Sequence, residues 1–223
     1  MTSIALRKDT WDRYILEEQK EYFKRIRTSR GDVWLDAGAN IGCFACVLAP
    51  RVKQIVCYEP DEDNLKVLKA NLESNGITNA IVVDKAIVGN SDTSRSFNTA
   101  LVSNKGLHSF CDFLPPEHVK KTTVQTENID YIIGRFGINK IMMDVEGAEQ
   151  EILTSMKRWD AIREIMLEWH GKVLKDDDGA KRKELVGLLK KHFGILREKQ
   201  NCGGDTYLIY GRRSSPPTAE KQA

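Results

Sequence analysis

Short apolar runs alternate along the chain with longer segments whose apolar residues recur every three or four positions. The runs predict strands buried on both faces. They lie at residues 32–36, 54–58, 80–84, 139–143, 162–167, 193–198 and 206–211. The segments between them predict helices at residues 41–50, 61–75, 126–137 and 180–192. Strands that alternate with helices indicate an α/β fold with three layers, α/β/α, around a mostly parallel sheet.

A further helix is predicted before the sheet, within residues 9–28. Its aromatic and aliphatic side chains have the three- and four-residue spacing of an amphipathic helix, and they are Trp11, Tyr14, Ile15, Tyr22 and Ile26. Glu17, Glu18 and Glu21 interrupt the basic residues of the other face. A solvated helix that docks on the core is therefore favoured over a nucleic-acid surface.

The regular alternation breaks at residues 94–121, a polar stretch that also contains aromatic side chains. It is too long for an ordinary connector, and its aromatic residues argue against disorder. We therefore expect an insertion that faces the substrate, and its first part, residues 94–103, is compatible with an added hairpin. Regular structure then returns with a helix capped by Thr126 and closed by Gly137.

Length and composition fit one globular domain. The chain has 223 residues, 41% of them hydrophobic, and a formal net charge of +2, which neither demands nor excludes nucleic acid. We expect residues 1–30 to form a helical segment over the core, residues 31–211 the main domain, and residues 212–223 a flexible tail. No apolar run approaches the ~20 residues that span a bilayer, and no secretory signal pattern begins the sequence. The expectation is a cytoplasmic protein without membrane contact.

The first candidate site follows the first strand of the main domain. Gly38, Asn40 and Gly42 indicate a tight turn into a helix, and Glu59 lies 21 residues beyond Gly38, where an acidic residue commonly bonds ribose hydroxyls. The dinucleotide fingerprint is incomplete, because Asn40 stands where a third glycine would be. Asp36 adds a carboxylate that would repel a diphosphate and hold an ammonium group. The pattern favours S-adenosylmethionine, which has a ribose and an ammonium group but no phosphate.

Ligands of open α/β sheets bind outside the carboxyl ends of the strands. Asp84 and Ala86 follow the third predicted strand, so we expect them at the adenine edge of the pocket. Asp144, Glu146 and His170 follow later strands and are candidate bases for removing a proton from an acceptor.

Two of these later residues allow other interpretations. Glu146 either positions the acceptor or caps the helix that follows it. A lone histidine such as His170 is more often structural, although its ordinary pKa suits proton transfer. Asp144, Glu146 and Glu168 are suitable ligands for Mg²⁺, but carboxylates at strand ends occur without metals, and we expect none here.

The stretch Leu35-Asp-Ala-Gly-Ala-Asn-Ile-Gly42 resembles the first motif of class I methyltransferases, and in this form the FkbM-like family in particular. The blocks Asp144-Val-Glu-Gly-Ala-Glu149 and Leu167-Glu-Trp-His170 are also similar to that family. The resemblance covers nearly all of residues 31–211. It implies a Rossmann-like class I methyltransferase fold, a seven-stranded sheet with one antiparallel strand, and transfer to oxygen on a small molecule or sugar.

The resemblance also assigns cofactor contacts by position. It places Asp36, Gly38, Asn40 and Gly42 at the methionine end, Glu59 at the ribose, Asp84 and Ala86 at the adenine, and Asp144 beside the methionine group or the acceptor. It leaves the acceptor least defined, because the N-terminal helix and residues 94–121 are where this chain can depart from the family.

Three other functions remain open. A methyltransferase acting on nucleic acid could use the basic N-terminal helix for phosphate contacts, and Lys140, Asp144 and Glu168 could belong to a Lys-Asp-Lys-Glu set for ribose methylation. The missing glycine disfavours a nicotinamide dehydrogenase. A binding module without catalysis is disfavoured because a silent pocket needs neither Gly38 nor Glu59.

Overall fold

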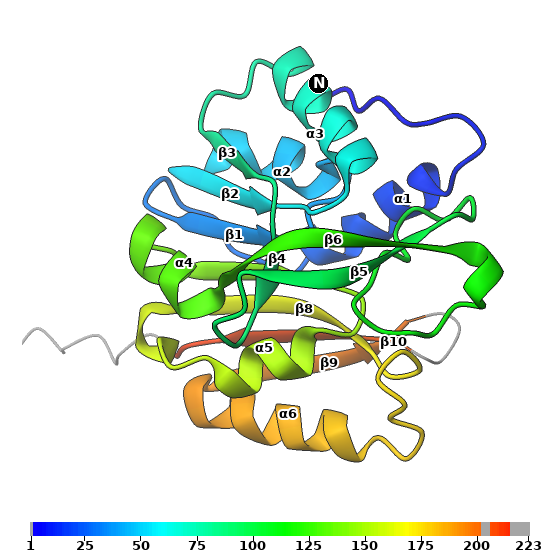
Figure 1. Cartoon of the computed structure of the whole chain (residues 1–223). Coiled ribbons are helices and arrows are strands. Elements are labelled where there is room, and N and C mark those ends of the chain that lie inside the picture. The colour runs from blue at the N-terminus through cyan, green and yellow to red at the C-terminus, as the bar shows by residue number, and fades with distance from the viewer. Residues whose placement is uncertain (1, 202–205, 215–223) are drawn as a thin grey trace, which may run out of the picture.

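The computed structural model describes residues 2–201 and 206–214, and most of them surround one twisted sheet (Figure 1). The described part of this sheet has seven strands. In spatial order they are β3 (Ala80–Val83), β2 (Gln54–Tyr58), β1 (Val33–Ala37), β7 (Lys140–Met143), β8 (Glu164–His170), β10 (Thr206–Arg212) and β9 (Ile195–Gln200). Only β10 among them runs antiparallel to its neighbours. The strand order reverses beside β1, which creates a crevice at the carboxyl ends of β1 and β7.

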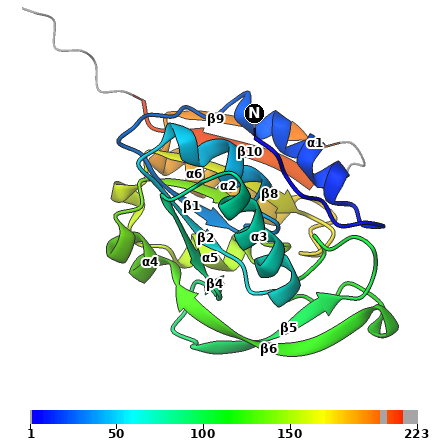
Figure 2. The ribbon, with the colours of Figure 1, turned by 90° about the horizontal axis from the view of Figure 1, so that it is seen from above.

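Helices cover both faces of the sheet, as Figures 1 and 2 show. They are α1 (Asp12–Phe23), α2 (Cys43–Leu48), α3 (Glu62–Ser74), α4 (Ile129–Phe136), α5 (Glu149–Ser155) and α6 (Ala180–His192). One buried cluster joins Trp34 of β1 to the first three helices, and another joins Leu35 to the last three. Alternate residues of a strand point to opposite faces. Because helices cover both faces of this sheet, residues on both faces are apolar, and the apolar runs are continuous. The predicted three-layer fold is confirmed.

Many predicted boundaries are confirmed where a local signal defines them. Strand β2 and helix α6 have the predicted limits. The Asp61 side chain caps α3 by accepting the amide hydrogens of Asp63 and Asn64, and Gly137 ends α4 in the left-handed conformation. Most of the predicted tail, residues 212–223, lies outside the described residues.

The predicted helix cap at Thr126 is wrong. Residues Val119–Asn128 form a ten-residue strand, β6, and the cap of α4 is Asn128, whose side chain accepts the amide hydrogens of Asp130 and Tyr131. Thr126 instead donates its hydroxyl to the carbonyl oxygen of Asp92 at 2.5 Å. The threonine-rich stretch takes the extended form because it pairs with a distant strand, and β-branched residues suit such pairing.

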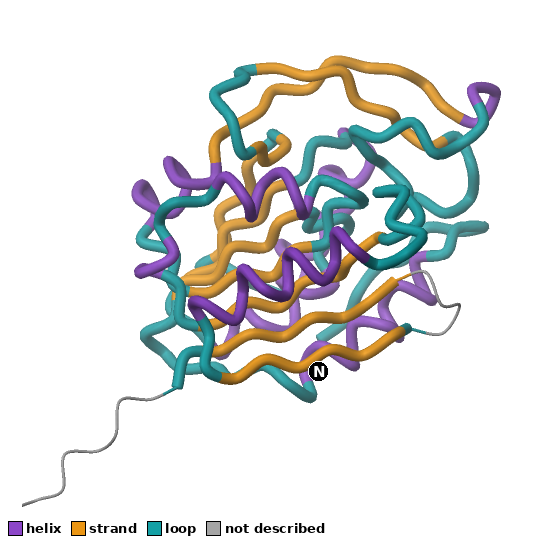
Figure 3. Tube along the Cα trace, turned by 90° about the horizontal axis from the view of Figure 1, so that it is seen from below, coloured by secondary structure: helices purple, strands orange, loops and turns teal. Residues whose placement is uncertain are grey.

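That partner is β5 (Ser94–Ala100), which runs antiparallel to β6. With β4 (Ala86–Val88) these strands form a second sheet in the order β4-β6-β5, seen at one side of the molecule in Figures 2 and 3. The expected insertion thus consists of β5, a long connection that includes a short 3-10 helix (Pro116–His118), and the beginning of β6. Two other 3-10 turns, Ala49–Arg51 and Trp159–Ala161, lie in connections of the main domain.

A buried ion cluster ties the central strands together at their amino ends. The Nζ atom of Lys140 lies 3.1 Å from Asp32 Oδ2 and 2.8 Å from Glu164 Oε2, and it donates to the carbonyl oxygen of Arg27 at 2.6 Å. Lys140 is 7% exposed and both carboxylates are more deeply buried. The segments that enter β1, β7 and β8 are therefore held together opposite the crevice. Within the described residues, no helix combines the length and apolar character needed to cross a membrane.

We expect Lys140→Met to lower the free energy of unfolding by about 3–5 kcal/mol, because it leaves two buried carboxylates without their cation. Urea titration would measure the loss. Lys120→Met, at an exposed position of β6, is the matched control and should change stability little. Equal stabilities of the two variants would contradict a structural role for the Lys140 cluster.

Candidate active site

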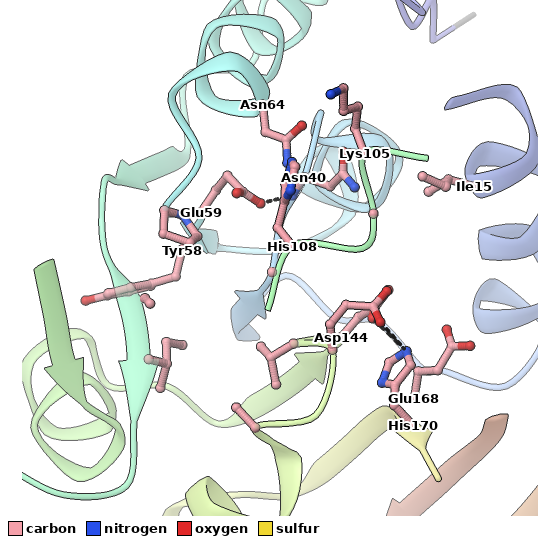
Figure 4. A pocket seen from close by; sticks show the side chains of 18 of the residues that line it. Ile15, Asn40, Tyr58, Glu59, Asn64, Lys105, His108, Asp144, Glu168 and His170 are labelled. Atoms are coloured by element: carbon pink, nitrogen blue, oxygen red, sulfur yellow. Dashed lines mark hydrogen bonds and ion pairs between the residues drawn. The ribbon is translucent and has the colours of Figure 1, made fainter. Parts of the chain in front are cut away.

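A cleft opens at the carboxyl ends of β1, β2, β7 and β8, where the fold places the crevice (Figure 4). Its walls come from the turn after β1, the ends of the neighbouring strands, α1, and the connection between β5 and β6. Five side chains of α1 line the cleft, namely Tyr14, Ile15, Glu18, Gln19 and Tyr22. The cleft is therefore built by the strand ends of the main sheet and completed by α1 and the connection between β5 and β6.

The turn after β1 depends on three residues with positive φ angles, namely Gly38 at +82°, Asn40 at +50° and Gly42 at +83°. A Cβ atom on Gly38 would lie 1.8 Å from the carbonyl oxygen of Asp144, so only glycine lets this turn pass the end of β7. A Cβ atom on Gly42 would lie 2.4 Å from Leu68 Cδ1. Gly38 and Asn40 line the cleft, whereas Gly42 does not and instead lets α2 pack against α3.

Glu59, at the end of β2, is bonded to the backbone on both sides. Its Oε2 atom accepts the Asn40 amide hydrogen at 2.8 Å and its Oε1 atom accepts that of Asp61 at 2.9 Å. The residue is 4% exposed, and burial raises the pKa of its carboxyl to about 7. Each oxygen has a second lone pair, so the fixed carboxylate can also accept a hydrogen bond from a ligand in the cleft.

Besides Gly42, two other predicted cofactor residues, Asp36 and Asp84, do not line the cleft. Asp36 is buried, and its Oδ2 atom has no hydrogen-bond partner among the residues that the structure describes. Burial, followed by the charge of Glu59, raises its pKa to about 8. The side chain of Asp84 is exposed. Its neighbours Lys85 and Ala86 line the cleft in its place. Asp36 and Asp84 thus do not line the cleft, whereas Ala86 does, and the cofactor contacts expected of all three stay predictions.

At the other end of the cleft, His170 lies among carboxylates. Its Nε2 atom is 3.6 Å from Asp144 Oδ1 and 3.4 Å from Glu146 Oε2, while Nδ1 is 2.8 Å from Glu149 Oε1. Glu149 is fully buried and also accepts the amide hydrogen of Gly147 at 3.1 Å. The ring is therefore fixed in orientation. The alternative role of Glu146 as a helix cap does not agree with the structure, because α5 begins at Glu149 and Ala148 occupies the cap position.

The charges of this group differ from those of isolated side chains. Burial alone would lower the pKa of His170, but the carboxylates of Glu146 and Glu149 outweigh it and raise that pKa well above its usual value. Burial raises the pKa of Glu146 to about 7, and burial together with Glu168 raises that of Asp144 well above its ordinary range. The neighbouring acids thus favour the protonated imidazole of His170, while burial makes Glu146 and Asp144 themselves more ready to take up a proton.

Sequence reasoning gave no role to two residues of α1 that meet this group. The Tyr22 hydroxyl donates to Glu168 Oε2 at 2.6 Å, which ties the helix to β8. Glu18 also lines the cleft, and burial with the nearby Glu168 raises its pKa to about 7. The helical spacing predicted which face of α1 is buried, but nothing local to the sequence indicated its partner in β8.

The same side chains offer a set of ligand atoms for a metal ion. One atom each from Asp144, Glu146 and His170 lie within 4.8 Å of one another. Binding would require the Nε2 proton of His170 to leave, and that proton is held by the adjacent carboxylates. Glu168, a third oxygen ligand considered from the sequence, is occupied by Tyr22 and by Asn201 Nδ2 at 3.0 Å. Metal independence stays a prediction.

Lys140 does not join the chemical group. It lies at the first position of β7, in the buried ion cluster, whereas Asp144 follows the last position of that strand. A Lys-Asp-Lys-Glu set for ribose methylation is therefore not assembled from Lys140.

The chain matches the family model described as the methyltransferase FkbM domain over residues 36–202. A solved FkbM methyltransferase from Methylobacillus flagellatus superposes with a TM-score of 0.52 and 17% identity, covering 84% of this chain and 45% of that one. This chain thus spans less than half of that protein. The comparison with curated proteins gives no match.

Two other solved structures share the fold. A Streptococcus mutans protein described as a methyltransferase, in complex with S-adenosylhomocysteine, has a TM-score of 0.51 and 11% identity over 94% of this chain and 100% of its own. A precorrin-8w decarboxylase from Methanobacterium thermoautotrophicum has a TM-score of 0.50 and 16% identity, covering 87% of this chain and 89% of that one. At these identities the likeness concerns the fold alone.

Proposed function

This chain belongs to the FkbM family of methyltransferases, and we propose that it transfers the methyl group of S-adenosylmethionine to a hydroxyl group of a small molecule or sugar. The observation that carries the proposal is the group of carboxylates around His170 at one end of the cleft. It faces the end of β7, beside the glycine turn, where the fold would bring the sulfonium. Carboxylates at that point can hold a cation and accept the proton of a hydroxyl.

The cofactor would lie along the strand ends. We place its ribose at Glu59, its methionine part against the turn at Gly38 and Asn40, and its adenine toward Ala86. This order brings the sulfonium to Asp144. Asp36 would act from below the turn, through the field of its buried carboxyl, without touching the cofactor.

Methyl transfer forms a bond between the acceptor oxygen and the methyl carbon while the carbon–sulfur bond breaks and its electron pair stays on sulfur. The acceptor's proton must go elsewhere, and Asp144 or Glu146 is the acceptor we propose. His170 would serve as a fixed cation that keeps these carboxylates able to take the proton. The enzyme's main contribution would be alignment of the two reactants.

The surroundings of the cleft favour a small acceptor over nucleic acid. Lysines on α1 are paired within the helix, since Lys20 contacts Glu17 and Lys24 contacts Glu21, which leaves less positive charge for phosphates. The end of β7 reads Asp-Val-Glu-Gly, without the proline-rich motif that grips an exocyclic amine. Both features support oxygen on a small molecule or sugar.

Tritium transfer from labelled S-adenosylmethionine into a host-cell extract tests this proposal. The extract would be separated into small-molecule, nucleic-acid and protein fractions, with the Glu59→Ala variant as the control for enzyme-dependent label. Label in small molecules or glycans is expected. Nuclease-sensitive label would instead favour the nucleic-acid alternative, and label in protein would exclude both.

We expect Glu59→Ala to weaken binding of S-adenosylhomocysteine roughly tenfold to a hundredfold, because hydrogen bonds between ribose hydroxyls and a carboxylate are lost. Isothermal titration calorimetry would measure the affinity, and thermal unfolding would confirm that the variant is folded. Asp84→Ala is the matched control, because its carboxylate lies off the cleft wall. If the two variants bind equally well, the ribose lies elsewhere.

Cofactor affinity should depend on pH through the buried carboxylates. The pKa values of Glu18 and Glu146 are raised to about 7, so both lose protons as the pH rises from about 6 to about 8. The resulting negative charge favours the sulfonium of S-adenosylmethionine, whereas the sulfur of S-adenosylhomocysteine is neutral. The ratio of the two affinities, measured by calorimetry, should therefore shift toward S-adenosylmethionine with rising pH. A ratio independent of pH would argue that the sulfonium lies away from these residues.

His170→Asn tests the role of the imidazolium, because asparagine can keep a hydrogen bond to Glu149 while the charge is removed. We expect turnover to fall by about 10²-fold or more. The acid limb of the turnover–pH profile should move to higher pH, since carboxylates that lose a neighbouring cation hold their protons longer.

If the acid limb of the turnover–pH profile disappears in His170→Asn and is not merely shifted, His170 is itself the base. Turnover that falls with a chelator and returns with Mg²⁺ would assign these side chains to a metal site. Binding of S-adenosylhomocysteine to His170→Asn serves as the control for an intact cleft.

A further inference from the structure

His108 is a buried side chain of the insertion that the proposed reaction does not use. It lies in the connection between β5 and β6, is 8% exposed, and lines the cleft. Its Nδ1 atom accepts the amide hydrogen of Ala100 at 2.9 Å. A neutral ring that accepts at Nδ1 carries its proton on Nε2. The backbone of β5 therefore fixes both the position of the ring and its tautomer.

The Nε2 atom has no hydrogen-bond partner among the described residues. Buried donors nearly always have a partner, so an unpaired one in a cleft wall points to a ligand atom. The nearest carboxylate oxygen is Asp61 Oδ1 at 3.8 Å, beyond hydrogen-bond range. That oxygen already accepts the amide hydrogens of Asp63 and Asn64 as the cap of α3.

The ring is neutral as well as fixed. Burial lowers the pKa of His108 to about 4, and the positive charges of Lys105 and Arg7 act in the same direction against the opposing charge of Asp61. Its edge packs against Phe97, with ring centres 6.3 Å apart. A neutral imidazole donor in an apolar setting suits an uncharged oxygen, such as a hydroxyl.

The position of Nε2 identifies the part of the ligand that it would meet. Asp61, its nearest acidic neighbour, donates its amide hydrogen to Glu59, and Asn40 donates to the other oxygen of the same carboxylate. His108, Asn40 and Glu59 line the same cleft, and Figure 4 shows all three away from His170. The unpaired donor thus lies next to the residue to which the ribose is assigned.

We propose that His108 is a cofactor-positioning residue whose Nε2–H group donates a hydrogen bond to a ribose hydroxyl oxygen, while Glu59 accepts a hydrogen bond from the ribose. This inference rests on the proposed function, because it requires a ribose at Glu59. A ribose hydroxyl both donates and accepts, so the two side chains satisfy different capacities of the same group. The insertion would then contribute directly to cofactor recognition in addition to facing the acceptor.

His108→Asn is the direct test, because the asparagine oxygen can take the place of Nδ1 and accept the Ala100 amide hydrogen, while nothing replaces Nε2. We expect S-adenosylhomocysteine to bind about threefold to tenfold more weakly, with little change in the melting temperature. His118→Asn is the matched control, since His118 is an exposed histidine of the same insertion. It should bind like the wild type.

Analogues of S-adenosylhomocysteine that lack the 2′ or the 3′ hydroxyl separate a ribose contact from a general effect on folding. One of them should bind wild type and His108→Asn with nearly equal affinity, because the hydrogen bond is already absent. A variant with a merely disturbed cleft would lose affinity for all three ligands alike. His108→Gln, which can place an amide donor near the Nε2 position, should regain part of the discrimination between the ligands.

Equal binding of S-adenosylhomocysteine by wild type and His108→Asn would overturn the inference and leave the proposed function intact. The same loss with all analogues would also overturn it, and would make His108 a support for the insertion. If wild type does not bind S-adenosylhomocysteine, the proposed cofactor fails first and the ribose contact fails with it.

Discussion

The imidazolium of His170 allows several carboxylates to share one end of a narrow cleft. Burial raises the pKa values of Asp144 and Glu146 even beside this ring, and without its positive charge both pKa values would be higher still. Glu149 holds the ring from beneath at 2.8 Å, so the charge has a fixed position. The remaining negative charge faces the cleft and is suited to a ligand that is itself a cation. Binding and proton transfer therefore draw on the same electrostatic arrangement.

This arrangement divides the central sheet into two functional ends. At the amino ends of β1, β7 and β8, Lys140 bridges two buried carboxylates, Asp32 and Glu164, so its charge is used within the structure. At the carboxyl ends, the acidic side chains outnumber the one histidine, and Asp144 Oδ1 has no hydrogen-bond partner within the described part of the chain. The two ends thus differ: the first cluster is closed by its own cation, whereas the second presents acidic groups to the cleft.

The parts of the fold that were predictable from sequence are those set by local chemistry. Asp61 caps α3 and Gly137 closes α4 because the necessary side chain or φ angle belongs to the residue itself. The start of α4 was misplaced because β6 extends through Thr126, and a strand exists only where a partner is available. That partner, β5, lies beyond a long connection whose path no local pattern defines.

The site divides in the same way. The glycine turn and Glu59 could be found from spacing within one strand–turn–helix unit, whereas the bond of His170 to Glu149 joins residues on β8 and α5. The contribution of α1 through Tyr22 and that of the insertion through His108 depend on contacts between distant segments. Asp84 shows the converse limit, since a residue at a strand end can point to solvent while its neighbours line the cleft.

The proposed reaction has a consequence for the charge inside the cleft. S-adenosylmethionine brings a positive sulfonium, and transfer leaves a neutral sulfur while a proton moves from the acceptor hydroxyl to Asp144 or Glu146. The net charge of the cleft is therefore the same before and after the chemical step, and a sulfonium and a carboxylate become two neutral groups, which burial does not penalise. Once Asp144 or Glu146 releases this proton to solvent, the ionised carboxylate again favours the cationic S-adenosylmethionine over the neutral S-adenosylhomocysteine. Release of that proton would then favour replacement of bound S-adenosylhomocysteine by S-adenosylmethionine.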